Sequence, residues 1–94
     1  MVFIFQFVNV VYYIDLLIDR KDQVINLCEM KYSLSEYVID AEYEQKLRNK
    51  KSVFIDTTNT RKAVHMTMVT TFGIKANAHS GIVQNEITLE DLFS

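Results

Sequence analysis

The sequence lacks proline and tryptophan altogether, and its 94 residues include only two glycines and one cysteine. This shortage of proline and glycine excludes collagen-like chains and Pro- or Gly-rich linkers. Cys28 has no second cysteine in the chain, so an internal disulfide is excluded and a reducing, cytoplasmic location is the simplest expectation. No Gly-rich phosphate loop occurs, so we expect no ATP to be bound by a recognisable route.

The chain also lacks a strong charge of either sign, because ten Lys and Arg stand against twelve Asp and Glu. Proteins that bind nucleic acid through their overall charge are usually basic, so any binding of DNA here must use a local patch. Six basic residues fall in one short segment and are candidates for contacting phosphates. They are Lys46, Arg48, Lys50, Lys51, Arg61 and Lys62. The alternative, which we favour because nearby acids balance much of this charge, is a solvated helix face.

Apolar residues, which make up 49% of the chain, are dense enough for a globular core. The first eighteen residues contain only Gln6, Asn9 and Asp15 as plainly polar positions. A membrane-spanning helix needs about 20 apolar residues, and Asp15 interrupts the run, so we expect no membrane segment. No basic start or small-residue cleavage site of a signal peptide is visible. Because Val, Ile, Phe and Tyr dominate, residues 1–13 are predicted to form a buried or interface strand.

The hydrophobic pattern predicts the order β-β-β-α-β-β-α, which is typical of an α/β domain on a mixed central sheet. We expect strands at about 1–13, 13–19, 24–32, 62–71 and 82–87, a long helix at 40–56 and a short C-terminal helix at 89–93. The whole chain, 1–94, is treated as a single domain because no linker or repeat interrupts it.

Local signals mark both helices. Asp40 is a good N-cap, and Thr88 with Asp91 has the spacing of a capping box. The long helix has two (i, i+4) ion pairs in the favourable order, Glu42 with Lys46 and Glu44 with Arg48. It also has an apolar stripe, which consists of Tyr43, Leu47 and Phe54.

Three charged residues, Asp15, Glu29 and Lys31, interrupt otherwise apolar strands. A charge inside an apolar strand is costly unless it faces solvent, a partner or a metal. Glu29 and Lys31 are two residues apart and share a face. Pairing of Arg20 with Val24 around a three-residue turn would place Asp15 opposite Glu29, whereas a shift of one residue would turn Asp15 to the other face.

Two carboxylates on one face can hold a hard cation such as Mg²⁺. A lysine beside them can orient a water molecule or stabilise charge on a phosphate oxygen. This combination suits metal-dependent hydrolysis of a phosphodiester. The alternative is that Asp15 faces solvent at a strand edge and that Glu29 and Lys31 form a surface pair worth about 0–1 kcal/mol.

The segments that carry these residues, IDLLID and INLCEMK, resemble the Asp…Glu-x-Lys signature of the PD-(D/E)XK nuclease superfamily. More narrowly, residues 14–93 are similar to the C-terminal domain of bacterial AAA-type ATP-binding proteins, in which a nuclease-like domain follows an ATPase domain. The segments YEQKLRNK, TRKAVHMTMVTTFGIK and GIVQNEITLEDLF carry this second resemblance.

The resemblance implies a restriction-endonuclease-like core and cleavage of DNA with Mg²⁺, for which Mn²⁺ could substitute. It implies that Asp15 and Glu29 are metal ligands, that the Met30 carbonyl assists, and that Lys31 positions or activates the attacking water. Lys31, Asp15 and Glu29 are therefore the candidate catalytic residues.

The chain departs from the family upstream of Asp15, where residues 1–13 stand in place of the helix that begins the superfamily core. The ATPase domain is absent as well, so we expect a C-terminal fragment of such a protein. The fragment is either an active nuclease or a non-catalytic interaction module with the same fold. In the second case, residues 2–13 would pair with a second copy of the chain or with a partner, because a free apolar strand is an edge liability.

Overall fold

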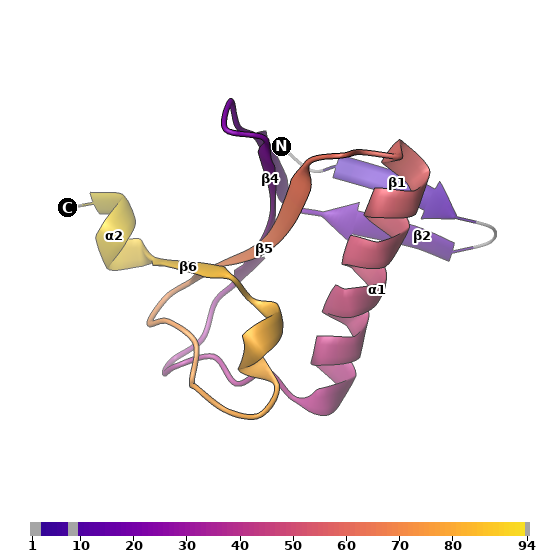
Figure 1. The fold of residues 1–94 in the computed structure, drawn as a ribbon. Helices are drawn as coiled ribbons and strands as arrows, with labels where there is room; N and C mark the ends of the chain where they lie inside the picture. The colour runs from indigo at the N-terminus through magenta and orange to yellow at the C-terminus, as the bar shows by residue number, and fades with distance from the viewer. Residues whose placement is uncertain (1–2, 8–9, 94) are drawn as a thin grey trace.

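Four strands form a mixed sheet in the order β3-β4-β5-β6 in the computed structural model (Figure 1). The structure describes residues 3–7 and 10–93, and the side chains of residues 15–91. The strands are β3 (Leu16–Asp19), β4 (Val24–Lys31), β5 (Ala63–Thr70) and β6 (Asn85–Thr88). The first pair is antiparallel, and β4, β5 and β6 run parallel. The long helix α1 (Ala41–Thr58) connects β4 to β5, and the short helices η1 (Ser80–Ile82) and α2 (Leu89–Phe93) flank β6. The chain is thus an α/β domain with one long helix, as predicted.

The N-terminal segment differs from the single strand predicted over residues 1–13. Two strands, β1 (Phe3–Phe7) and β2 (Val10–Ile14), pair antiparallel and form a separate two-stranded sheet. Residues 1, 2, 8 and 9 lie outside the described part of the chain. Strands longer than about ten residues are unusual, and folding back lets the two halves satisfy each other's backbone groups.

Within the described residues, no helix is both long enough and apolar enough to cross a lipid bilayer.

The predicted strand 13–19 is divided at Asp15, because β2 ends at Ile14 and β3 begins at Leu16. The carboxylate Oδ2 of Asp15 accepts the backbone N–H of Met30 at 2.8 Å. Aspartate competes in this way with regular backbone pairing, which gives a physical reason for the break.

The hairpin of β3 and β4 has the register on which the site prediction depends. Leu16 pairs with Cys28, and the Arg20 N–H donates to the Val24 carbonyl oxygen at 2.9 Å. The turn between these two residues has three residues, and the register continued by one step places Asp15 opposite Glu29.

The hydrophobic core lies between α1 and one face of the sheet. Leu47 and Phe54 of the predicted stripe are buried, and Tyr43 packs against the core while remaining partly exposed. The sheet contributes a row of buried apolar side chains, which are Ile25, Leu27, Val64, Met66 and Met68. Burial of this apolar area is the main favourable contribution to folding.

Two loops lie side by side at the end of the sheet where β4 and β5 finish. The Tyr37 N–H donates to the Gly73 carbonyl at 2.8 Å, and the Lys75 N–H donates to the Tyr37 carbonyl at 2.9 Å. Gly73 has a φ of 92°, a conformation that side-chain-bearing residues rarely adopt.

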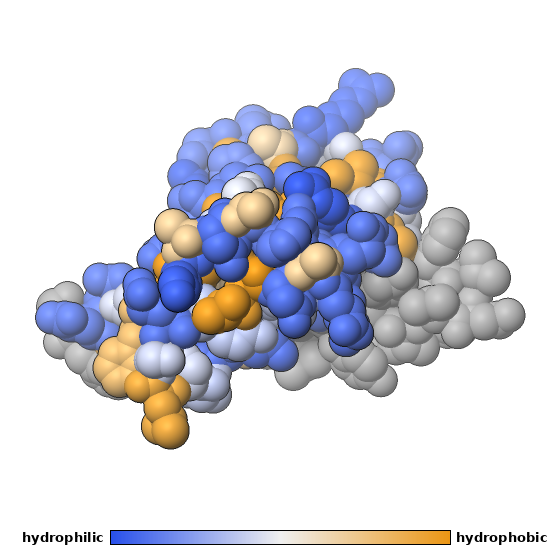
Figure 2. Space-filling model, turned by 90° about the horizontal axis from the view of Figure 1, so that it is seen from below, coloured by the Kyte–Doolittle hydropathy of each residue, from blue (hydrophilic) through white to orange (hydrophobic). Residues whose placement is uncertain are grey.

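The face of the molecule in Figure 2 is mainly hydrophilic, with apolar groups in separate small areas. The most exposed large apolar residues include Tyr32, Leu34, Val38 and Phe72.

Capping interactions begin both helices as predicted. Asp40 Oδ1 accepts the Tyr43 N–H at 2.7 Å at the start of α1. At the start of α2, the Thr88 N–H donates to Asp91 Oδ2 at 2.9 Å and the Asp91 N–H donates to Thr88 Oγ1 at 3.2 Å, which is a reciprocal capping box. These bonds satisfy N–H groups that have no partner inside the helix.

Loss of the Asp40 cap should weaken the domain measurably. We expect Asp40→Ala to lower the free energy of unfolding by about 1 kcal/mol, because the Tyr43 N–H loses its acceptor. Asp56→Ala is the matched control, since this exposed carboxylate lies in the last turns of the same helix, where a negative charge is unfavourable. Urea denaturation should show no loss of stability for Asp56→Ala, and an equal loss in both variants would contradict the capping role.

Candidate functional site

The side chains of Glu29 and Lys31 lie on the face of the sheet that α1 covers. Side chains alternate along a strand, so both residues share a face with Leu27, which is 1% exposed in the core. Glu29 is itself 3% exposed, whereas Lys31 is partly exposed. Asp15 enters from the junction of β2 and β3, opposite Glu29. The hairpin register therefore brings the three predicted residues to one end of one face.

Glu29 has Lys50 as its ion partner. The Nζ atom of Lys50 lies 2.5 Å from Glu29 Oε1, and the two side chains are only 21% and 5% exposed. Burial raises the pKa of Glu29 above its ordinary value, and the hydrogen bond and charge of Lys50 oppose that rise. The interpretation of Glu29 and Lys31 as an exposed surface pair is therefore wrong.

The charges of Asp15 and Lys31 also act on Glu29. Asp15 raises the pKa of Glu29 by like-charge repulsion, and Lys31 lowers it. The Asp15 carboxylate is held by the N–H of Met30, the neighbour of Glu29 on β4. The resemblance implied a role for the Met30 carbonyl, whereas the described contact of Met30 uses its amide. This bond fixes the Asp15 carboxylate beside the end of β4.

The ammonium group of Lys31 lies over an aromatic ring. Its Nζ atom is 5.3 Å from the centroid of the Tyr43 ring, a cation–π arrangement. Tyr43 packs edge-on against Tyr37, with ring centroids 5.7 Å apart. Burial raises the pKa of the Tyr43 phenol, and the charge of Glu29 raises it further, so the ring stays neutral. Within the described residues, the buried Tyr43 hydroxyl has no hydrogen-bond partner.

A pocket of about 450 Å³ opens beside this cluster. Its walls carry three ammonium groups, two tyrosine rings and two carboxylates, belonging to Lys31, Lys46, Lys50, Tyr37, Tyr43, Asp40 and Glu42. Lys31 and Lys50 belong both to the pocket and to the cluster around Glu29. The pocket therefore offers ammonium groups to an anion, and Lys50 connects it to Glu29, although Asp15 and Glu29 are not among its described lining residues.

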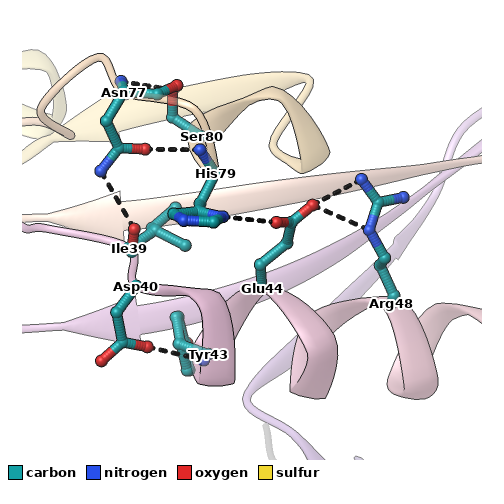
Figure 3. Close-up of polar contacts among 8 residues, drawn as sticks. All are labelled: Ile39, Asp40, Tyr43, Glu44, Arg48, Asn77, His79 and Ser80. Carbon is teal, nitrogen blue, oxygen red and sulfur yellow. Dashed lines mark hydrogen bonds and ion pairs between the residues drawn. The ribbon is translucent and has the colours of Figure 1, made fainter.

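The loop between β5 and β6 fixes the helix end that forms one wall of the pocket (Figure 3). The Nδ1 atom of His79 lies 2.8 Å from Glu44 Oε1, and Asn77 Nδ2 donates to the Ile39 carbonyl at 3.0 Å. Glu44 also pairs with Arg48 at 2.6 Å. The hydrogen bonds from His79 and then Arg48 lower the pKa of Glu44, so the carboxylate stays ionised. These contacts hold the first turns of α1 in place.

The four candidate phosphate-binding residues on α1 have different surroundings. Lys46 and Lys50 line the pocket, and Lys46 is also 4.0 Å from Glu42. Arg48 is paired with Glu44, and Lys51 lies beside a separate shallow hollow. Only two of these four side chains therefore face the candidate site.

Arg61 and Lys62 lie far from the pocket. Both precede β5, whose first residue pairs with Val24, whereas Lys31 is at the opposite end of β4. The length of β4 separates these ends by roughly 20 Å. Lys62 is also paired with Asp19 at 2.7 Å. The described structure does not gather the six basic residues into a single patch.

Asp15 and Glu29 are the two carboxylates that a divalent cation at this site would have to share. Magnesium is usually held by one or two protein carboxylates, with water filling its other positions. Within the described residues, no group of three or more His, Cys, Asp or Glu side chains is arranged to hold a metal. Each carboxylate has one oxygen in a described contact, with Met30 or with Lys50. A cation at Glu29 would therefore have to compete with the ammonium of Lys50.

The sequence pattern does not by itself reveal the roles of Lys50 and Tyr43 at this site. The pattern predicts Tyr43 as a member of the apolar stripe and Lys50 as a candidate phosphate-binding residue. The signal was present in the spacing, because Lys50 falls between Leu47 and Phe54 at the (i, i+3) and (i, i+4) intervals of the buried stripe. A lysine in a buried stripe needs a buried acceptor, and Glu29 is that acceptor.

Comparisons with protein-family models, with curated proteins and with solved structures find no match for this chain. Its chemistry must therefore be inferred from the cluster itself. Two neighbouring carboxylates, a lysine held over an aromatic ring and an adjoining basic pocket can bind a divalent cation and a phosphate group side by side. The same residues can also serve only to stabilise the fold.

Proposed function

We propose that this chain is a nuclease-like domain that hydrolyses phosphodiester bonds of DNA with Mg²⁺. In this proposal the domain has a restriction-endonuclease-like fold and is the C-terminal part of an AAA-type ATP-binding protein. The proposal is carried by the register that sets Asp15 opposite Glu29, with Lys31 on the same face. The resemblance of these strands to the Asp…Glu-x-Lys signature supports DNA as the substrate. The parallel connection from β4 through α1 to β5 agrees with that fold.

Each residue has a defined role in this proposal. Asp15 and Glu29 would hold the cation, which supplies positive charge to the phosphate and favours ionisation of the attacking water. Lys31 positions that water or neutralises charge that develops on the phosphate oxygens. The Tyr43 ring holds the Lys31 ammonium in place, and Lys46 offers a contact to a phosphate in the pocket.

The direct test is nicking of supercoiled plasmid DNA by the purified chain in Mg²⁺ or Mn²⁺. We expect nicking that stops when the metal is chelated and that Lys31→Ala slows by about 100-fold, the usual effect of losing one charge-stabilising group. Lys21→Ala, in the exposed turn at the other end of the hairpin, should nick at the wild-type rate. Intact plasmid with both metals would exclude catalysis by this chain.

Two observations favour a second function, that of a non-catalytic interaction module. Lys50 already neutralises Glu29, so the folded state does not need a metal at this position. The pair β1 and β2 forms a small sheet of its own, which contacts α1 and β4 without joining the four-stranded sheet, and a two-stranded sheet needs such further packing to be stable. In this alternative, the apolar hairpin pairs with a second copy of the chain.

Light scattering coupled to size-exclusion chromatography distinguishes the two functions. A stable dimer that becomes a monomer when residues 1–13 are deleted would support the interaction module, especially if the plasmid stays intact. A monomer with metal-dependent nicking would support the nuclease. A monomer without nicking would contradict both.

A further inference from the structure

Lys50 links the buried carboxylate of Glu29 to the pocket. Its ammonium lies 2.5 Å from Glu29 Oε1, and its side chain also lines the pocket together with Lys31 and Lys46. Among the ion pairs of the described residues, this pair has the least exposed partners, at 21% and 5%. Solvent therefore screens it less than the others, and a second cation at Glu29 would repel the ammonium strongly.

We propose that Lys50 is an exchangeable counter-ion, which occupies the Glu29 carboxylate until a divalent cation displaces it into the pocket, where it becomes a phosphate-binding group. This inference rests on the proposed cation site at Asp15 and Glu29. The long, flexible stem of a lysine permits such a movement while its backbone stays in the helix. Because the side chain already lines the pocket, the ammonium needs only a change of partner.

Release of Lys50 changes the charge of the pocket. While Lys50 is bound to Glu29, the ammonium groups of Lys31 and Lys46 are balanced by two carboxylates on the pocket wall, those of Asp40 and Glu42. The freed ammonium adds one positive charge, so cation binding should increase the affinity for phosphate. By thermodynamic linkage, phosphate should increase the affinity for the cation by the same factor.

The first test measures the dissociation constant of Mn²⁺ by the electron paramagnetic resonance of the free ion, without DNA. We expect Lys50→Gln to bind Mn²⁺ about tenfold more tightly than the wild type, because no ammonium competes for Glu29. The glutamine amide can still donate to Glu29, which protects the fold. Lys46→Gln is the matched control, because it removes a charge from the same pocket but leaves Glu29 paired, and it should change the affinity less than twofold.

The second test follows the wild type, so it does not depend on the folding of a variant. In nuclear magnetic resonance spectra of ¹⁵N-labelled lysine, the Lys50 ammonium signal should be visible without metal and should broaden by exchange with water when Mg²⁺ is added. Titration with inorganic phosphate should then shift the ring signals of Tyr37, which lines the pocket, at lower phosphate concentration in the presence of Mg²⁺ than in its absence.

The outcomes separate this inference from the proposed function. Equal Mn²⁺ affinities in the wild type and Lys50→Gln, or a Lys50 signal unchanged at saturating Mg²⁺, would overturn the exchange but leave the cation site standing. Absence of Mn²⁺ binding in the wild type and in both variants would overturn the exchange and the cation site together. Tighter binding in Lys50→Gln alone, with loss of the wild-type signal on Mg²⁺ addition, would establish the exchange.

Discussion

Replacing Lys50 with methionine is expected to lower the free energy of unfolding by about 3 kcal/mol at about pH 8, the usual effect of removing one partner from a buried ion pair. The methionine keeps most of the volume of the lysine stem but leaves the Glu29 carboxylate, whose side chain is 5% exposed, without its ammonium partner. An uncompensated charge in such a site is unfavourable because burial removes its hydration. Urea denaturation of the variant and the wild type measures the difference.

Two further variants show whether the loss comes from the unpaired charge. Lys46→Met removes a lysine from the same helix, but Lys46 and Glu42 are 4.0 Å apart and largely exposed, so we expect a change near zero. The double variant Glu29→Gln with Lys50→Met removes both charges and should recover most of the lost stability. If it is as unstable as Lys50→Met alone, the stem of Lys50 rather than its charge is what matters.

The stability loss of Lys50→Met should depend on pH. Burial raises the pKa of Glu29 in the folded state above its ordinary value of 4.5, and Lys50 opposes that rise. Because the pKa of Glu29 is raised in the folded state, its protonation stabilises the fold fully below pH 4.5. This stability is lost as the pH rises through the folded-state pKa. Without Lys50 the folded-state pKa of Glu29 is higher still, so the Lys50→Met variant loses more stability over a wider range of pH. The difference from wild type should be smallest near pH 4.5 and should increase toward neutral pH, and a difference independent of pH would contradict this account.

Leu47→Ala should destabilise the domain by about 3 kcal/mol, because truncation of a fully buried leucine leaves a cavity as well as losing apolar burial. Leu47 is 0% exposed and belongs to the core between α1 and the sheet. For a domain of this size the expected decrease in melting temperature is about 15 °C. Thermal unfolding followed by circular dichroism measures it.

The control for Leu47→Ala is Leu34→Ala. Leu34 is 101% exposed in the loop after β4, so its truncation should change the free energy of unfolding by less than about 0.5 kcal/mol. Leu47 also lies on the helix between Tyr43 and Lys50, the two α1 residues that hold Lys31 and Glu29. If Leu47→Ala unfolds at the wild-type temperature, the packing of α1 on the sheet is not what stabilises the domain.

Elements that depend on short-range interactions could be predicted from the sequence. The Asp40 cap and the capping box of Thr88 and Asp91 join residues three positions apart, whereas the pattern left the register of the hairpin between Arg20 and Val24 open. The N-terminal hairpin could not be predicted, because residues 1–13 are mostly β-formers and contain neither glycine nor proline to mark a turn.

By itself, the sequence determined where the helices begin, the α/β class and the face shared by Glu29 and Lys31, since each follows from the period of helix or strand or from contacts within one turn. Only the tertiary structure decided that Glu29 is buried and that its partner is Lys50, which lies 21 residues away on α1. It likewise decided that Lys31 rests on Tyr43 and that the six basic residues are dispersed. Such contacts depend on how the helix lies on the sheet, a choice made by the packing of the whole core and not by any local pattern.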